Sequence, residues 1–131
     1  MYSIHNQKVE NQEFNVIHVK QQHIEVTFMD YGATILEILV PNKDGVLENV
    51  VMNYQDLSSY VKNVMCLNAI IGPTSGRIRD AEFKINEKQY HLDKNHLNKH
   101  NLHGGSECFA YRVFNFEILE DDITTKVIFT V

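Results

Sequence analysis

The dominant pattern along the chain is an alternation of apolar and polar residues with a period of two. In residues 23–29 the apolar side chains fall at every second position, which is typical of a strand with one buried face. Residues 33–40 are apolar on both faces except at Glu37, and this predicts an interior strand. No window carries the 3.6-residue period of a long amphipathic helix. The pattern therefore predicts an all-β domain.

Turn signals divide the rest of the chain into short strands. Residues 41–45 read Pro-Asn-Lys-Asp-Gly, and further turns are expected at 86–88 and 121–122. Asp56 is expected to cap a single helical turn that runs through Tyr60. The remaining strands are expected over residues 49–52, 67–71, 83–85, 90–92, 111–119 and 124–131.

The last predicted strand is still alternating at Val131, after Val127 and Phe129. A sheet that stopped here would leave unpaired backbone groups along an edge and bare apolar surface on one face. We therefore expect the chain to be truncated, as the N-terminal portion of something larger. Self-association of two copies through the open edge is the alternative.

Composition narrows the class of protein. A chain of 131 residues with 44% hydrophobic and 22% charged residues is ordinary for one soluble globular domain. The net charge of −5 argues against a nucleic-acid partner, because a phosphate backbone requires a basic face. Charges interrupt every long apolar stretch and no secretion signal is visible, so we expect neither a membrane partner nor export. Cys66 and Cys108 form no metal or redox motif, and we expect reduced thiols in the cytoplasm.

The candidate chemistry lies in residues 71–105, which read IGPTSGRIRDAEF, a polar hairpin, and NKHNLHGG. Arg77 leaves a glycine-punctuated loop, and His103 lies in a Leu-His-Gly-Gly turn. An arginine fork can donate to two adjacent sugar hydroxyls, and a histidine exchanges protons near neutral pH. The glycines permit positive φ and let a backbone approach a ligand closely. Taken singly, Arg77 would be a solvated surface residue and His103 a structural histidine, but their combination predicts a sugar site.

Four histidines in one stretch, His91, His96, His100 and His103, raise the possibility of a metal site. Zinc needs three or four converging ligands, and helical spacing would bring only the last three histidines to one face. Because a loop separates and follows them, we expect no metal ion. His91 alternates with apolar neighbours and is expected on the solvent face of a strand.

Three motifs, taken in order, resemble the aldose 1-epimerase family of the galactose mutarotase-like superfamily. They are DYGATILEILVPNKDG at 30–45, ENVVMNYQDLSSYVKN at 48–63, and the pair IGPTSGRI and NLHGG. Each is short, but their ordered combination is specific. The resemblance implies a large, twisted antiparallel β-sandwich, a supersandwich more than twice this length. Residues 1–131 would be the N-terminal part of that single domain.

The resemblance also implies a reaction, the interconversion of α and β anomers of aldoses such as galactose and glucose, without metal or organic cofactor. Ring opening removes a proton from the anomeric hydroxyl and delivers one to the ring oxygen. By resemblance, Arg77 falls on the sugar-binding arginine, and His103 on a histidine that supports binding and proton transfer. The backbone of Gly76 is a further candidate contact. The principal acid histidine and the glutamate base are expected C-terminal to Val131.

Several positions depart from the family pattern. Gly76 stands where an asparagine is usual, Pro73 where an arginine or another side chain is common, and Cys108 where a glycine is usual. The chain also lacks tryptophan. These departures indicate a divergent branch. Phe109 or Tyr111 could supply an aromatic platform for a sugar face.

Three alternative functions stay open. The chain could be a carbohydrate-binding module that does not turn the sugar over, or an inactive fragment of an epimerase. It could also belong to a hexose-6-phosphate epimerase, which would require additional basic residues for the phosphate. Arg79 and Lys84 are close to Arg77 in sequence and are the candidates for that role.

Overall fold

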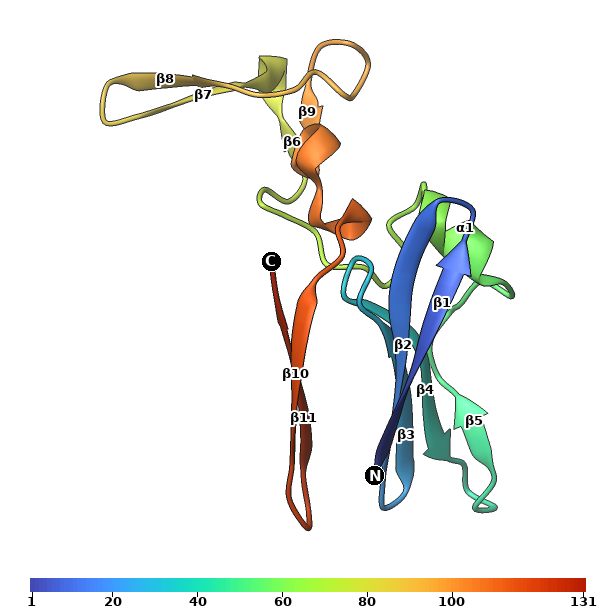
Figure 1. Cartoon of the computed structure of the whole chain (residues 1–131). Coiled ribbons are helices and arrows are strands. Elements are labelled where there is room, and N and C mark those ends of the chain that lie inside the picture. The colour runs from blue at the N-terminus through green and yellow to red at the C-terminus, as the bar shows by residue number, and fades with distance from the viewer.

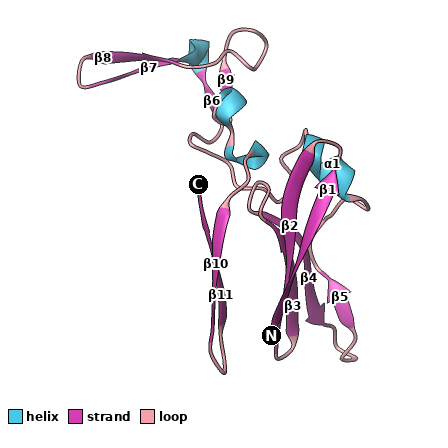
Figure 2. Cartoon of the chain, viewed as in Figure 1, coloured by secondary structure: helices cyan, strands magenta, loops and turns pink.

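The computed structural model describes residues 1–131, and antiparallel strands dominate it (Figures 1 and 2). The first layer is a five-stranded sheet in the order β1-β2-β3-β4-β5. Its strands are β1 (Tyr2–Val9), β2 (Gln12–Gln21), β3 (Ile24–Met29), β4 (Thr34–Pro41) and β5 (Leu47–Asn49). The second layer is a hairpin of β10 (Asn115–Glu120) and β11 (Thr125–Thr130), which lies beside the sheet in Figure 1. This confirms the all-β prediction.

The part of the chain between β5 and β10 forms only short strands, short helices and irregular loops. It contains the strands β6 (Arg77–Ile78), β7 (Glu82–Ile85), β8 (Lys88–His91) and β9 (Asn101–Leu102), the helix α1 (Leu57–Lys62) and three 3₁₀ turns, η1 (Arg79–Ala81), η2 (Gly105–Glu107) and η3 (Phe109–Tyr111). β6 pairs with β9, and β7 pairs with β8. The β7-β8 hairpin projects away from both layers (Figure 1), and its turn lies at residues 86–87, as predicted.

One face of the five-stranded sheet carries the main core. Phe14 from β2, Met29 from β3 and Leu36 from β4 pack with Tyr31 and with Tyr60 of α1. All five side chains are buried. Burial of large apolar and aromatic side chains is the main stabilising term in a domain of this size. The helix is therefore held on the sheet by Tyr60 and not by its own length.

The opposite face of the sheet meets the β10-β11 hairpin through aromatic side chains. The Phe28 ring contacts the Phe129 ring edge to face, with centroids 6.0 Å apart, and Phe114 meets Phe129 at 6.4 Å. Two apolar cavities of about 330 and 340 Å³ remain between the layers, and Phe28 and Val127 line both. The sheet thus has apolar side chains on both faces, and β4, predicted to be interior, lies between β3 and β5.

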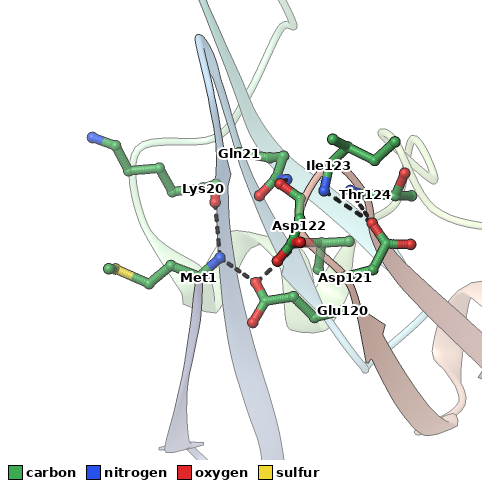
Figure 3. Close-up of polar contacts among 9 residues, drawn as sticks. Met1, Lys20, Gln21, Glu120, Asp121, Asp122, Ile123 and Thr124 are labelled. Atoms are coloured by element: carbon green, nitrogen blue, oxygen red, sulfur yellow. Dashed lines mark hydrogen bonds and ion pairs between the residues drawn. The ribbon is translucent and has the colours of Figure 1, made fainter.

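Polar contacts join the far ends of the two layers (Figure 3). The Gln21 side chain at the end of β2 donates to the Asp122 carbonyl at 3.3 Å. The Met1 ammonium group donates to the Lys20 carbonyl at 3.2 Å and to the Glu120 carboxylate. These exposed contacts align the tip of the hairpin with the β2-β3 turn.

The helix cap at Asp56 is confirmed. Its Oδ1 accepts a hydrogen bond from the Ser59 amide at 3.0 Å, and the Ser58 hydroxyl also donates to it. These bonds lower the pKa of Asp56, with the Ser58 hydroxyl the largest cause. A side-chain acceptor at this position satisfies an amide that has no partner within the helix. The cap starts α1 at Leu57, and this start places Tyr60 in the main core.

Three strand predictions need correction. Residues 67–71 form no strand, because Cys66 and Asn68 adopt φ of 50° and 57°, and Ile70 is 48% exposed. The strand expected from residue 111 begins at Asn115, because residues 109–111 form η3 and pack Ala110 against Gly32. The strand expected at 49–52 is β5 at Leu47–Asn49.

The hydrophobic pattern predicts no strand before residue 23, although β1 and β2 lie there. In β2, Phe14 and Ile17 are both fully buried on opposite faces of the sheet, so the strand lacks a clear period of two. In β1, the apolar residues Tyr2 and Ile4 are exposed, so they do not form a buried apolar face that would identify the strand.

Candidate functional site

The predicted site residues Arg77 and His103 lie at one end of the β6-β9 pair, where Arg77 is paired with Leu102. Gly76 precedes Arg77 and adopts φ of 75°, and His103 adopts φ of 55°. Two hydrogen bonds join Gly76 to His103. The His103 amide donates to the Gly76 carbonyl at 3.0 Å, and the Gly76 amide donates to His103 Nδ1 at 3.2 Å. The fold therefore anchors His103 to the residue that precedes Arg77.

The contact with Gly76 sets the tautomer of His103. A backbone amide only donates, so His103 Nδ1 accepts and the proton of the neutral ring is on Nε2. No hydrogen bond in the structure uses Nε2, and the side chain is half-buried. The ring is thus oriented from one side and offers an N–H donor on the other.

The Arg77 side chain is exposed, and one contact orients it. Its Nε donates to His96 Nε2 at 3.2 Å. The two terminal Nη groups make no hydrogen bond or ion pair within the chain. A guanidinium held in this way keeps its outer fork free for two adjacent acceptors, such as neighbouring sugar hydroxyls.

Gly76 contributes to the site through both of its backbone polar groups, which bond to His103. A Cβ at Gly76 would meet no atom within 4 Å, so the positive φ and not close packing favours glycine there. A direct contact from the Gly76 backbone to a sugar stays a prediction. In contrast, a Cβ on Gly104 would lie 2.4 Å from the Gly72 carbonyl oxygen, so this glycine allows two loops to touch.

Polar side chains hold the His103 turn in place. The Asn95 side chain donates to the Leu102 carbonyl at 2.9 Å and accepts from the Leu102 amide at 2.8 Å. Asn101, which is 1% exposed, donates to the Asp93 carbonyl at 3.0 Å. The Asp93 carboxylate accepts from the Ser106 hydroxyl and from the Ser106 amide, and these bonds lower the pKa of Asp93. Sequence reasoning missed these residues, although an asparagine-rich loop is the composition from which such bonds form.

The match to known proteins decides the family. The model of the aldose 1-epimerase family matches residues 15–131. The chain belongs to the aldose 1-epimerase family. This confirms the resemblance that the three motifs indicated.

The relatives of this aldose 1-epimerase family member are longer proteins. An aldose 1-epimerase of Streptococcus thermophilus is 32% identical over 124 residues, which cover 92% of this chain and 35% of that protein. The galactose mutarotase of Homo sapiens is 28% identical over 100 residues, covering 76% and 29% of the two chains. The chain spans about a third of the length of such curated relatives.

Solved structures confirm the fold of this epimerase-family chain. The crystal structure of galactose 1-epimerase from Lactobacillus acidophilus NCFM aligns with a TM-score of 0.77 at 23% identity. That alignment covers 92% of this chain and 35% of the other. The antiparallel β-sandwich that the family resemblance implied is therefore the fold. No helix is long and apolar enough to cross a membrane.

A small cavity of about 80 Å³ adjoins the turn that contains His103. Its lining includes His103, Cys66, Cys108 and Tyr111. Both cysteines are free thiols, and burial raises the pKa of Cys66. The Tyr111 hydroxyl lies 3.8 Å from Cys66 Sγ. The pKa of Tyr111 is raised to about 12, with burial as the largest cause and the contact with Cys66 as the next. Tyr111 thus links the site to the loop after α1.

Two groups of candidate residues have structural partners instead. The Phe109 ring packs against Gly72, where a Cβ would lie 2.4 Å from it. Among the histidines, His100 Nδ1 accepts from the Asp80 amide at 3.0 Å, and His91 is solvent-facing with 71% of its side chain exposed, as predicted. No three His, Cys, Asp or Glu side chains are grouped as metal ligands.

Proposed function

We propose that this chain provides the arginine and histidine of a sugar site in an aldose 1-epimerase, which interconverts the α and β anomers of an aldohexose such as galactose or glucose. The observation that carries the proposal is that the residue before Arg77 also orients His103. Gly76 donates to His103 Nδ1, and Arg77 follows Gly76, so a free guanidinium fork and a free Nε2–H donor start from the same turn. Two oriented donors of this kind suit the hydroxyl groups of a pyranose.

The roles of the two residues follow from their donors. Arg77 binds two neighbouring hydroxyls through its Nη groups. His103 donates from Nε2 on the side of the ring oxygen and so supports the proton delivery that opens the ring. No Asp or Glu side chain of the chain is bonded to Arg77 or His103. The proposed site of residues 1–131 therefore contains no carboxylate base.

The same lack of a carboxylate beside Arg77 and His103 favours a second candidate, a carbohydrate-binding module that does not accelerate anomer exchange. Binding and exchange are separable, because binding needs only the two donors and exchange needs an acid and a base. A hexose-6-phosphate epimerase is less well supported. Lys84 pairs with Glu87 at 3.3 Å on the β7-β8 hairpin, which projects away from both layers (Figure 1).

The test is magnetisation-transfer NMR of galactose and glucose with the purified chain, combined with a binding titration. We expect both sugars to bind, and Arg77→Ala and His103→Ala to weaken binding at least several-fold while the fold is kept. Lys84→Ala is the matched control and should bind as the parent chain does. Accelerated exchange that disappears in His103→Ala supports the epimerase.

Binding without acceleration supports a chain that only binds the sugar, either as a carbohydrate-binding module or as the binding part of an epimerase. A folded chain that binds neither sugar contradicts both functions.

A further inference from the structure

The contact between Arg77 and His96 places a constraint on the protonation of His96. The guanidinium is always protonated and its Nε only donates, so His96 Nε2 must accept the 3.2 Å bond. The imidazole of His96 is therefore neutral in this arrangement, with its proton on Nδ1. A doubly protonated ring has no acceptor and would lose this bond.

The loop between β8 and β9 fixes the position of His96. The His96 amide donates to the His100 carbonyl at 3.0 Å, and the His100 amide donates to the His96 carbonyl at 2.9 Å, which closes a small antiparallel turn. Asn95, the preceding residue, bonds to both backbone groups of Leu102 in β9. His96 is thus held close to β9, the strand that directly precedes His103, and its imidazole contacts Arg77 at the start of β6.

We propose that His96 is a positioning residue for Arg77, holding the guanidinium by Nε so that its two Nη groups face a sugar. This rests on the proposed function of Arg77 as a sugar-binding residue. A free arginine side chain samples many rotamers, and a bond at Nε restricts rotation of the guanidinium plane while leaving the outer fork unused. His96 does not touch the sugar in this arrangement.

The arrangement makes sugar binding sensitive to acid. When His96 is protonated, it loses the acceptor and places a positive charge beside Arg77. In the same turn, the ring centroid of His100 lies 6.4 Å from that of His96, and Asp80 pairs with Lys99 at 3.4 Å and with His100 at 4.0 Å. No carboxylate contacts His96 to stabilise a charged ring. Acidification therefore releases the guanidinium.

Two substitutions separate positioning from fold. His96→Gln keeps a side-chain acceptor that does not titrate, whereas His96→Ala removes the acceptor. His91→Ala is the matched control, since this histidine lies on β8 and is paired with Glu82 instead. Galactose and glucose affinity is measured by titration at about pH 8 and about pH 5, on either side of the range in which imidazoles titrate.

We expect His96→Ala to weaken sugar binding about 3- to 10-fold at the higher pH, as loss of one ordinary, solvent-exposed hydrogen bond implies. His96→Gln should bind as the parent chain does at that pH, and should lose less affinity on acidification. The loss that remains in His96→Gln reports on His103, which also accepts through a neutral ring nitrogen. Equal affinity of His96→Ala and the parent chain at the higher pH overturns the proposal.

A readout without sugar distinguishes failure of this inference from failure of the proposed function. The Arg77 Nε–H resonance, assigned by comparison with Arg77→Lys, should exchange slowly with water in the parent chain and in His96→Gln, and faster in His96→Ala. If this pattern is seen and neither sugar binds, His96 positions Arg77 but the proposed function is wrong. If exchange is the same in all variants, His96 does not position Arg77.

Discussion

Two regions of the molecule are held together by different forces. The sheet body, residues 2–62, has a continuous apolar core in which Phe14, Met29 and Tyr60 are at most 2% exposed. In the site loops, residues 72–107, the buried positions are Gly72, Ala81, Asn101 and Gly105, and none is a large apolar side chain. The body gains its stability from burial of apolar area, and the site loops must gain theirs elsewhere.

The site loops are held by hydrogen bonds from side chains to the backbone. Asn95 bonds to Leu102, Asn101 to Asp93, and Gly76 to His103. Each such bond contributes roughly 0.5–1.5 kcal/mol, and a buried group left without its partner costs about 1–3 kcal/mol. The loops can therefore open while the sheet body stays folded, as expected for binding segments placed on a rigid scaffold.

The largest expected effect is in the sheet body. Phe14→Ala removes a 1% exposed ring from the main core, and we expect a loss of about 3–5 kcal/mol in the free energy of unfolding. Chemical denaturation followed by far-UV circular dichroism measures it. Phe83→Ala is the control, because Phe83 stacks on Tyr90 at 5.0 Å in the projecting hairpin, outside this core. Similar losses in the two variants would break the distinction between the regions.

A smaller and more local effect is expected in the site loops. Asn101→Ala leaves the Asp93 carbonyl without the partner that now lies at 3.0 Å, at a cost of about 1–3 kcal/mol. Hydrogen exchange should show loss of protection at Leu102 and His103, with the amides of β2 and β3 unchanged. The exposed Lys94→Ala in the same loop should change neither set. Equal loss of protection in β2 and β3 would mean that the two regions unfold as one.

The difference between the sheet body and the site loops also explains which strands could be predicted from the sequence. Apolar periodicity located β3, β4 and both later hairpins, because each carries a repeated pattern of buried and exposed positions. It missed β2, which is buried on both faces. The strand predicted at residues 67–71 was wrong, because apolar composition does not encode the positive φ of Cys66 and Asn68.

The sequence indicates the two candidate residues of the site but not the residues that support them. Short motifs predict Arg77 and His103, and the structure bonds His103 to Gly76, the residue before Arg77. The supporting residues Asn95 and Asn101 bond mainly to backbone carbonyls and amides, whose positions depend on the folded loop. No period or spacing in the sequence records which carbonyl a given asparagine will meet.

The smallest expected effect tests where the two regions join. The Tyr111 hydroxyl lies 3.5 Å from the Asn63 carbonyl and 3.8 Å from Cys66 Sγ, so Tyr111→Phe should change stability little near neutral pH. Burial raises the pKa of Tyr111 to about 12 in the folded chain, whereas an unfolded tyrosine titrates near about 10. Between these values the unfolded state has released a proton that the folded state still binds, so stability falls as pH rises.

Tyr111→Phe removes this proton, so its stability should fall less steeply than that of the parent chain above about pH 10. Tyr31 and Tyr60, whose pKa values are also raised by burial, remain in both proteins and give a shared background slope. The exposed Tyr2→Phe should keep the parent slope. Denaturant titrations at several alkaline pH values measure the three slopes. If Tyr111→Phe and Tyr2→Phe give the same slope, the Tyr111 hydroxyl is not buried at the junction, and the site loops contact the sheet body without it.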